Sequence, residues 1–236
     1  MIYCISDIHG CYGEFLELLN KINFKPSDTV YFLGDAIDRG PDPIRCLQLI
    51  MKTPNIHMLM GNHEQLMLDA LTNEDEAFRG EVYKIWRHYN GGDATYVQYR
   101  KLPKNEQTEI LGFISTLPYY ALVKVRSKTY LLVHAGLNCK DRLPGEHLKT
   151  TVKRQKSSYP KDLLWIRGEF FYRKALPSHT IVFGHTPTKH LSQGMSHTIW
   201  KDKVFKDKIG IDCGCYSGGR LAALRLDDLE EFYVSK

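Results

Sequence analysis

Short apolar runs recur along the chain, and each of the first five ends in a polar turn that contains glycine. The runs are rich in Ile, Val, Tyr and Leu, without the polar alternation of a half-exposed strand. Continuous runs of this kind are typical of β-strands that are buried on both faces. The predicted strands are Ile2–Ile5, Thr29–Leu33, Ile56–Met60, Tyr130–Val133 and Thr180–Phe183, followed near the C-terminus by Ile209–Ile211, Leu221–Leu226 and Glu231–Val234.

The segments between these runs carry the spacing of amphipathic helices. Apolar residues from Phe15 to Ile22 recur at positions that share one helical face. Asp42 followed by a proline predicts the cap and the first turn of a second helix. Residues 64–71 and 74–90 are also predicted to be helical, and Asn105 is predicted to cap a helix that ends before Pro118.

The alternation of strands and helices predicts an α/β fold. In such folds the polar turns gather outside the carboxyl ends of the strands, at the edge of the sheet where ligands bind. The 236 residues contain no linker, internal repeat or low-complexity tract, so we expect one domain that spans residues 1–236. No window approaches the roughly 18 to 20 apolar residues of a membrane span, and we expect no membrane partner.

The net charge of +5 has a local origin. Residues 137–161 carry seven basic and two acidic side chains, which accounts for the whole surplus, so the charge does not describe a nucleic-acid binder. We expect this segment to be a solvated loop, with attraction of an acidic phosphopeptide as the alternative. The N-terminus lacks a secretory signal and the six cysteines are scattered, which predicts free thiols and a cytoplasmic location.

The polar turns supply oxygen and nitrogen donors that suit divalent metal ions. The candidate ligands are Asp7, His9, Asp35, Asn62, His134 and His185. A donor set of this kind favours Mn²⁺, Fe or Zn²⁺ over a sulfur-based structural site. Six ligands exceed the needs of one four-coordinate ion, but they fit two ions about 3.5–4 Å apart with a carboxylate such as Asp35 between them.

The order of the turns resembles a family signature. The signature consists of Asp-x-His-Gly at residues 7–10, Gly-Asp-x-x-Asp-Arg-Gly at 34–40, Gly-Asn-His-Glu at 61–64, His-Ala-Gly at 134–136 and Gly-His-Thr at 184–186. It resembles that of the calcineurin-like metallophosphoesterases. Within them, the chain is most similar to the bacterial and phage branch of the phosphoprotein phosphatases, to which the lambda phage phosphatase belongs, and the resemblance covers nearly the whole chain.

The resemblance implies a four-layered α/β/β/α fold, with two mixed sheets flanked by helices and a helical cap segment at about residues 72–120. It also implies two divalent metal ions at one sheet edge, most naturally Mn²⁺, with Fe, Zn and Ni as alternatives. The implied ligands are Asp7, His9 and Asp35 for the first ion and Asn62, His134 and His185 for the second, with Asp35 bridging the two.

Four further residues are assigned to catalysis. His63 is the candidate general acid that protonates the leaving group, and Asp38 would hold the tautomer of His63 through a hydrogen bond. Arg39 and Arg167 are the candidate phosphate-binding residues, together with Asn62, because a guanidinium group is planar, bidentate and always charged. Two ions would acidify a water molecule for in-line attack, so no covalent enzyme intermediate is required.

These roles predict a metal-dependent phosphomonoesterase that acts on phosphoproteins, with Ser/Thr phosphate preferred over Tyr phosphate. A small phosphoester is kept as the alternative substrate. A dinucleoside polyphosphate hydrolase is an alternative, which the intact Asp38-Arg39-Gly40 ending disfavours. A nuclease of the same superfamily is also an alternative. It is disfavoured because such nucleases usually end in Gly-His-x-His, whereas this chain reads Gly184-His185-Thr186-Pro187. An inactive binding module on the same fold is a third alternative, which the complete ligand set disfavours. We expect a monomer or a weak oligomer.

Two residues depart from the family pattern, and the role of one glycine pair stays open. Ser6 stands where the family usually has Gly, and Met60 stands where it often has Arg, so the second change bears on substrate recognition. The glycine pair Gly91-Gly92 either lets the cap segment approach the site closely or caps a helix.

Overall fold

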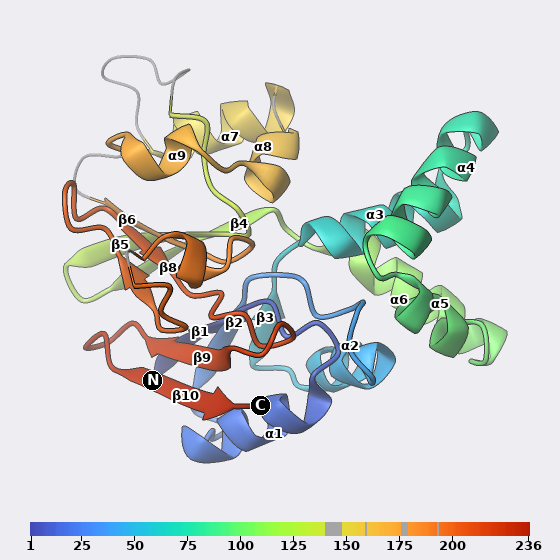
Figure 1. Ribbon diagram of the computed structural model, residues 1–236, viewed down its shortest axis with the longest axis horizontal. Coiled ribbons are helices and arrows are strands. Elements are labelled where there is room, and N and C mark those ends of the chain that lie inside the picture. The colour runs from blue at the N-terminus through green and yellow to red at the C-terminus, as the bar shows by residue number, and fades with distance from the viewer. Residues whose placement is uncertain (140–147, 159, 176–178, 193) are drawn as a thin grey trace.

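The computed structural model describes residues 1–139, 148–158, 160–175, 179–192 and 194–236 (Figure 1). The first of its two five-stranded sheets has the strand order β10-β9-β1-β2-β3. Its strands are β1 (Ile2–Ile5), β2 (Thr29–Phe32), β3 (Ile56–Met58), β9 (Arg220–Arg225) and β10 (Glu231–Ser235). β1, β2 and β3 are parallel, whereas β9 pairs with β1 and β10 in antiparallel fashion.

The second sheet has the order β4-β5-β6-β8-β7. Its strands are β4 (Tyr120–Val125), β5 (Lys128–Val133), β6 (His179–Phe183), β7 (Trp200–Lys201) and β8 (Lys208–Gly210). The three central strands are parallel, and the two edge strands β4 and β7 are antiparallel to their neighbours. Both sheets are therefore mixed, as expected.

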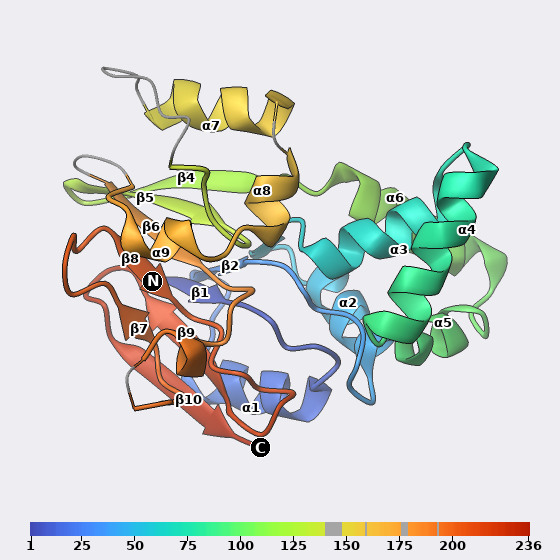
Figure 2. The same ribbon diagram turned by 45° about the horizontal axis from the view of Figure 1, so that its top comes forward.

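The helices form three groups in space. α1 (Tyr12–Lys21) and α2 (Pro43–Lys52) lie beside the first sheet, and α7 (Leu148–Ser158), α8 (Pro160–Trp165) and α9 (Glu169–Tyr172) cover the second sheet (Figures 1 and 2). The third group projects to one side of the sheets as a separate helical cap (Figure 2). It consists of α3 (Asn62–Thr72), α4 (Glu76–Lys84), the π-helical turn η1 (Ile85–Tyr89), α5 (Asp93–Tyr99) and α6 (Lys104–Thr116).

The strand alternation divides the apolar side chains among three buried clusters. Tyr3 and Ile5 of β1 join the cluster that contains the α1 and α2 side chains, whereas Cys4 joins the cluster between the two sheets. In β5, Leu132 faces the space between the sheets and Leu131 belongs to the cluster that contains the α8 and α9 side chains. Because successive side chains of a strand point to opposite faces, each sheet is covered on both sides. This confirms the expected four-layered α/β/β/α architecture.

Several expectations at the level of elements are corrected. Asn105 does not cap α6, because the helix begins at Lys104 with Pro103 at the cap position. Strand β4 and helix α5 were not predicted. Residues 148–158 of the basic segment form α7 instead of the expected loop, while residues 140–147 and 159 of that segment lie outside the described residues.

Five of the six cysteines are buried free thiols, as expected: Cys4, Cys11, Cys46, Cys213 and Cys215. Among the described residues, no helix combines the length and the apolar character that crossing a membrane requires.

Candidate metal centre

The predicted ligands follow the carboxyl ends of strands from both sheets. Asp7 and His9 follow β1, Asp35 follows β2, and Asn62 opens α3 after β3. The other two come from the second sheet, because His134 directly follows β5 and His185 follows β6. All six side chains are buried. The turns therefore come from strands of both sheets, whereas the sequence analysis expected the metal ions at one sheet edge.

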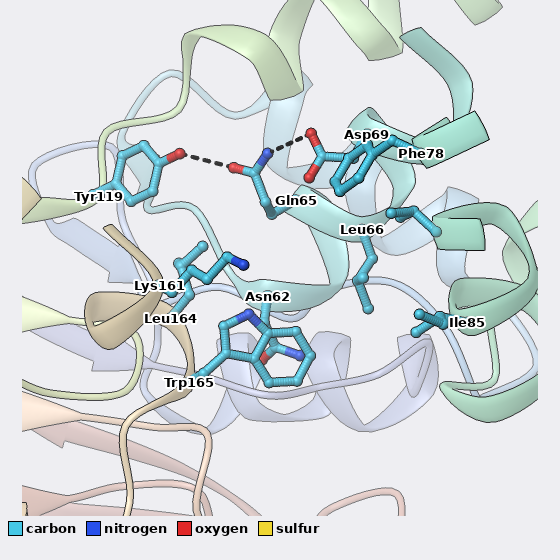
Figure 3. Close-up of a pocket in the computed structure, with 11 residues that line it drawn as sticks. Asn62, Gln65, Leu66, Asp69, Phe78, Ile85, Tyr119, Lys161, Leu164 and Trp165 are labelled. Atoms are coloured by element: carbon cyan, nitrogen blue, oxygen red, sulfur yellow. Dashed lines mark hydrogen bonds between the residues drawn. The ribbon is translucent and has the colours of Figure 1, made fainter. Parts of the chain in front are cut away.

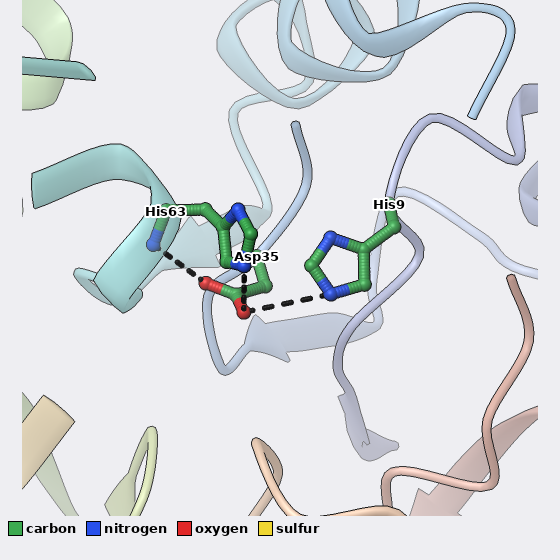
Figure 4. Close-up of side chains that lie close together, drawn as sticks. All are labelled: His9, Asp35 and His63. Carbon is green, nitrogen blue, oxygen red and sulfur yellow. Dashed lines mark hydrogen bonds and ion pairs between the residues drawn. The ribbon is translucent and has the colours of Figure 1, made fainter. Parts of the chain in front are cut away.

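Asp35 lies at the centre of this cluster. Its Oδ2 atom is 3.6 Å from His9 Nε2, 3.8 Å from His63 Nε2 and 3.5 Å from His134 Nε2. Its Oδ1 atom accepts a hydrogen bond from the backbone N–H of His63 at 3.1 Å, so the carboxylate is fixed on one side and faces the imidazoles on the other (Figure 4).

Asn62 lies close to the two histidines of the second sheet. The Oδ1 atom of Asn62 lies 2.8 Å from His134 Nε2 and 2.9 Å from His185 Nδ1. Asp7 is tied to the same region, because both of its carboxylate oxygens accept the backbone N–H of His185 at 3.0 and 3.1 Å. Residues separated by up to 178 positions along the chain are thus brought to one place.

Hydrogen bonds to backbone carbonyls determine which ring nitrogen is available. His9 Nδ1 donates to the carbonyl of Ile37 at 2.9 Å, and His134 Nδ1 donates to the carbonyl of Leu33 at 2.7 Å. A carbonyl accepts and never donates, so Nδ1 carries the proton and Nε2 presents a lone pair to the cluster. Partners of this kind orient metal-binding imidazoles.

The arrangement fits two divalent ions. Two groups of three side chains have ligand atoms within 4.8 Å of one another, namely His9, Asp35 and His63, and Asp35, His134 and His185. Asp35 belongs to both groups, as a bridging carboxylate must. The first group contains His63, the candidate acid, and does not contain the predicted ligand Asp7. In addition, the buried Nε2 atom of His185 has no hydrogen-bond partner among the described residues, and a buried polar atom of this kind needs one.

Burial sets the protonation of these groups. It raises the pKa of Asp7 to about 6 and the pKa of Asp35 to about 7, because the charged form of a carboxylate loses its hydration. For the same reason it lowers the pKa of His9 and of His185 well below the ordinary value. His9 and His185 are therefore neutral, the form that binds metal, and cations next to the carboxylates would offset the desolvation of Asp7 and Asp35.

The predicted acid lies against the same cluster. His63 Nδ1 is 2.6 Å from Asp38 Oδ2, and both side chains are fully buried. The guanidinium group of Arg39 spans the site, since one nitrogen lies 2.8 Å from His9 Nε2 and another 2.8 Å from His63 Nε2. Arg167 also reaches the site, where its guanidinium donates to the carbonyl of His185 at 3.2 Å.

The turns that carry these residues are conformationally strained. Six site residues adopt the left-handed region of positive φ, between 41° and 72°: Asp7, His9, Asp35, Asp38, Arg39 and His185. For side chains other than glycine this conformation costs on the order of 1–3 kcal/mol and persists only where the surroundings enforce it. Such concentration at one place is typical of a functional site.

Two buried acids at the site were missed by the sequence analysis. Glu64 accepts the backbone N–H groups of Asp35 and Ala36 at 2.8 and 2.9 Å, and so shapes the turn that carries Asp35. Asp212 follows β8 and lines a small cavity with Asp7, His9 and Arg39. A signal existed for Asp212, because Ile209–Ile211 is an apolar run that leads into Asp-x-Gly, as in the other turns.

A larger cavity of about 540 Å³ opens beside the cluster (Figure 3). It lies between the helical cap and α8, and Asn62 contributes to its wall. Most of its lining is apolar, including Leu66, Phe78 and Trp165, while Tyr119 donates to Gln65 Oε1 at 2.8 Å on one side. A group attached to a phosphate at the metal centre would have an apolar surface to enter.

The model of the calcineurin-like phosphoesterase family matches residues 1–216. The chain therefore belongs to the calcineurin-like phosphoesterases. It is a metallophosphoesterase, a hydrolase that uses divalent metal ions, and the alternative of an inactive binding module is not supported.

Relatives with two different named activities resemble the whole chain. Serine/threonine-protein phosphatase 2 of Salmonella typhimurium is 27% identical over 232 residues, which cover 95% of this chain and 92% of that protein. The asymmetrical bis(5'-nucleosyl)-tetraphosphatase PrpE of Geobacillus sp. is 26% identical over 255 residues, which cover 98% of this chain and 92% of that protein. These two similarities leave the substrate undecided.

A solved structure supports the fold. A protein serine/threonine phosphatase from Saccharomyces cerevisiae superimposes with a TM-score of 0.60 at 17% identity, and the match covers 99% of this chain and 78% of that one. At this identity the likeness concerns the fold alone.

Proposed function

We propose that the chain is a metal-dependent phosphomonoesterase that removes phosphate from phosphoserine and phosphothreonine residues of proteins. The observation that carries the proposal is the position of His63. The Nδ1 atom of His63 lies 2.6 Å from Asp38 Oδ2. On the opposite side of the ring, His63 Nε2 lies 3.8 Å from Asp35 Oδ2 at the centre of the ligand cluster. A proton donor so placed can serve the oxygen that leaves a phosphate bound there.

The proposed ligands are those that the sequence predicts, with Asp7, His9 and Asp35 for one ion and Asn62, His134, His185 and Asp35 for the other. We propose Mn²⁺ as the resident ion and the cytoplasm as the location. When bound, two such ions acidify water and neutralise charge on phosphoryl oxygens.

The chain's own side chains supply the remaining functions. Arg39 and Arg167 bring two guanidinium groups to the site, which suits a phosphate dianion. Burial, the largest cause, and the charge of Arg39 lower the pKa of His63 well below its ordinary value. A bound dianion offsets the charge of Arg39 and favours a proton on Nε2, from which the leaving oxygen takes it.

The cavity beside Asn62 supports a protein substrate. Of its described lining residues, Lys161 alone carries a positive charge, and Asp69 offsets it. A polyphosphate chain would find little charge compensation there. In contrast, Trp165 and Phe78 offer aromatic surface to apolar side chains that flank a phosphorylated residue.

A substrate panel tests the proposal. Mn²⁺-loaded protein is assayed with phosphoserine, phosphothreonine and phosphotyrosine peptides and with diadenosine tetraphosphate, and kcat/KM is measured for each. We expect the phosphoserine and phosphothreonine peptides with apolar flanking residues to be the best substrates. Release of phosphate from neither the phosphoserine nor the phosphothreonine peptides would contradict the proposal.

The second candidate is hydrolysis of dinucleoside polyphosphates. The observation that favours it is the similarity to the Geobacillus tetraphosphatase, which extends over as much of the chain as the similarity to the Salmonella phosphatase. A higher kcat/KM for diadenosine tetraphosphate than for every phosphopeptide would establish this candidate instead.

A further inference from the structure

Two residues of the helical cap hold Asp38, the partner of the proposed acid. Trp86 Nε1 donates a hydrogen bond to Asp38 Oδ2 at 2.9 Å, and Thr95 Oγ1 donates to Asp38 Oδ1 at 2.5 Å. Trp86, Thr95 and Asp38 have no exposed surface. Buried hydrogen bonds to a carboxylate are stronger than neutral ones and costly to break.

The hydroxyl group of Thr95 can adopt only one orientation. Its oxygen accepts the backbone N–H of Asp38 at 2.9 Å, so its single proton is directed to the Oδ1 atom of the same residue. Thr95 therefore fixes both the backbone and the carboxylate of Asp38. With Trp86 and His63 on Oδ2, three donors hold the carboxylate, and rotation about its χ2 angle breaks all three bonds.

The glycine pair Gly91-Gly92 of the cap packs closely against Arg39 and Trp86. A Cβ atom at Gly92 would lie 2.6 Å from the Trp86 ring, and one at Gly91, where φ is +78°, would lie 2.8 Å from the Arg39 side chain. The carbonyl of Gly91 also accepts the backbone N–H of Arg39 at 3.0 Å. The pair thus lets the cap segment close over Asp38 and Arg39, where a π-helical turn, a feature frequent at functional sites, presents Trp86.

We propose that Trp86 and Thr95 are positioning residues for the proton-transfer step. They fix the Asp38 carboxylate, and through it the plane and the tautomer of the His63 imidazole, so that Nε2 faces the leaving oxygen. The helical cap then has a role in catalysis besides forming a wall of the cavity. This inference rests on the proposed function, because it assigns these residues to the acid step of that reaction.

Conservative variants test the proposal with two aryl phosphates. Thr95→Val keeps the shape and removes the hydroxyl, Thr95→Ser keeps the hydroxyl, and Trp86→Phe removes only the donor and part of the ring. For Thr95→Val and Trp86→Phe we expect kcat to fall about tenfold or more on phenyl phosphate, whose poor leaving group needs the acid, and little on 4-nitrophenyl phosphate. Thr95→Ser is expected to restore kcat.

The matched control is Thr108→Val. Thr108 is an exposed cap residue whose hydroxyl donates to the carbonyl of Lys104 and not to Asp38. We expect it to leave both rates unchanged. Equal losses on both substrates for Thr95→Val, or a Thr95→Ser variant as impaired as Thr95→Val, would show that Thr95 has only a structural role and overturn the proposal.

A double-mutant cycle asks whether Thr95 acts through His63. Added to His63→Asn, Thr95→Val is expected to cause no further loss on phenyl phosphate, because the group that it positions is already gone. Multiplicative losses would contradict the proposal.

An NMR signal separates this inference from the proposed function. In the Zn²⁺-loaded protein the Nδ1 proton of His63 is expected to exchange slowly with water, in wild type and Thr95→Ser but not in Thr95→Val. Wild-type protein inactive on every phosphomonoester would refute the proposed function while this signal still decides the role of Thr95. A signal unchanged in Thr95→Val would refute that role.

Discussion

At the scale of single residues, Asp35 links the two halves of the centre. It belongs to both groups of potential ligands, and its Oδ2 atom lies 3.5–3.8 Å from three imidazole nitrogens. A carboxylate in that position would neutralise charge on two cations at once, so we expect its removal to affect both ions and not one.

We expect Asp35→Asn to abolish tight binding of both metal ions and, with it, hydrolysis. An amide keeps the shape and one oxygen ligand but loses the negative charge between the cations. Metal content after gel filtration measures the effect. The control is Asp75→Asn, since Asp75 caps α4 and asparagine caps a helix equally well. Retention of two ions by Asp35→Asn would contradict the bridging role.

The acid role of His63 gives a second prediction. His63→Asn is expected to retain both metal ions and to lose about 100-fold or more in kcat on phenyl phosphate, which is the usual contribution of a general acid. The loss on 4-nitrophenyl phosphate is expected to be much smaller, because that leaving group needs no proton. Equal losses on the two substrates would exclude His63 as the acid.

The affinity for metal is expected to fall as the pH is lowered through 7 to 6. Burial raises the pKa of Asp35 to about 7 and of Asp7 to about 6, so below these values protons occupy the carboxylates that the ions need. Because burial keeps the pKa of His9 and of His185 well below the ordinary value, these two histidines add nothing in this range. Calorimetric titration with Mn²⁺ at several pH values measures the slope, and an affinity that rises as the pH falls would contradict the account.

At the scale of elements, the close approach of the turns after β2 and β3 positions Asp35. A Cβ atom at Gly61 would lie 2.3 Å from Asp35 Oδ1 and 2.4 Å from Glu64 Oε2. A glycine at the start of α3 is thus needed for the helix to deliver Asn62 and His63 next to Asp35.

Gly61→Ala is expected to destabilise the fold and to weaken metal binding, because the methyl group must displace Asp35 or Glu64. Overpacking of this kind typically costs about 1–3 kcal/mol. The control is Gly112→Ala in α6, where a Cβ atom meets nothing within 4 Å, so the helix should gain up to about 1 kcal/mol. Urea unfolding and metal content measure both effects, and the outcome that contradicts the account is a Gly61→Ala variant as stable and as metal-rich as wild type.

The sequence was informative where an element is buried on both faces. Runs such as Ile2–Ile5 and Tyr130–Val133 are continuously apolar because both sheet faces are covered, and they were located within a few residues. β4 was missed because it is an edge strand that alternates exposed and buried positions, with Lys124 exposed between Val123 and Val125.

The candidate ligands were predictable because each follows an apolar run within a few residues. The residues that support them were not. Trp86 and Thr95 lie 48 and 57 positions from Asp38, and Glu64 lies 29 positions from the Asp35 N–H that it accepts. A contact over such a separation depends on how the cap packs on the sheets, and no local pattern encodes it.

At the scale of the whole molecule, the centre connects the two sheets. Asp7, His9, Asp35 and Asn62 belong to turns of the first sheet, whereas His134 and His185 belong to the second. Ions held by ligands from both sheets bind only the folded state, in which those ligands meet.

The thermal midpoint of unfolding is therefore expected to rise with the Mn²⁺ concentration. An ion that binds only folded protein adds about 2.7 kcal/mol at a hundredfold excess over its Kd. Differential scanning calorimetry across a Mn²⁺ titration measures the shift, and Asp35→Asn serves as the control in which the midpoint should not move. A wild-type midpoint that is independent of metal would contradict a centre that joins the sheets.

The most direct measurement is anomalous diffraction from a crystal of the Mn²⁺-loaded protein, recorded at the manganese absorption edge. The account predicts two peaks per chain, one on each side of the Asp35 carboxylate, with His9 beside one and His134 and His185 beside the other. A single peak, or two peaks that do not share Asp35, would contradict it.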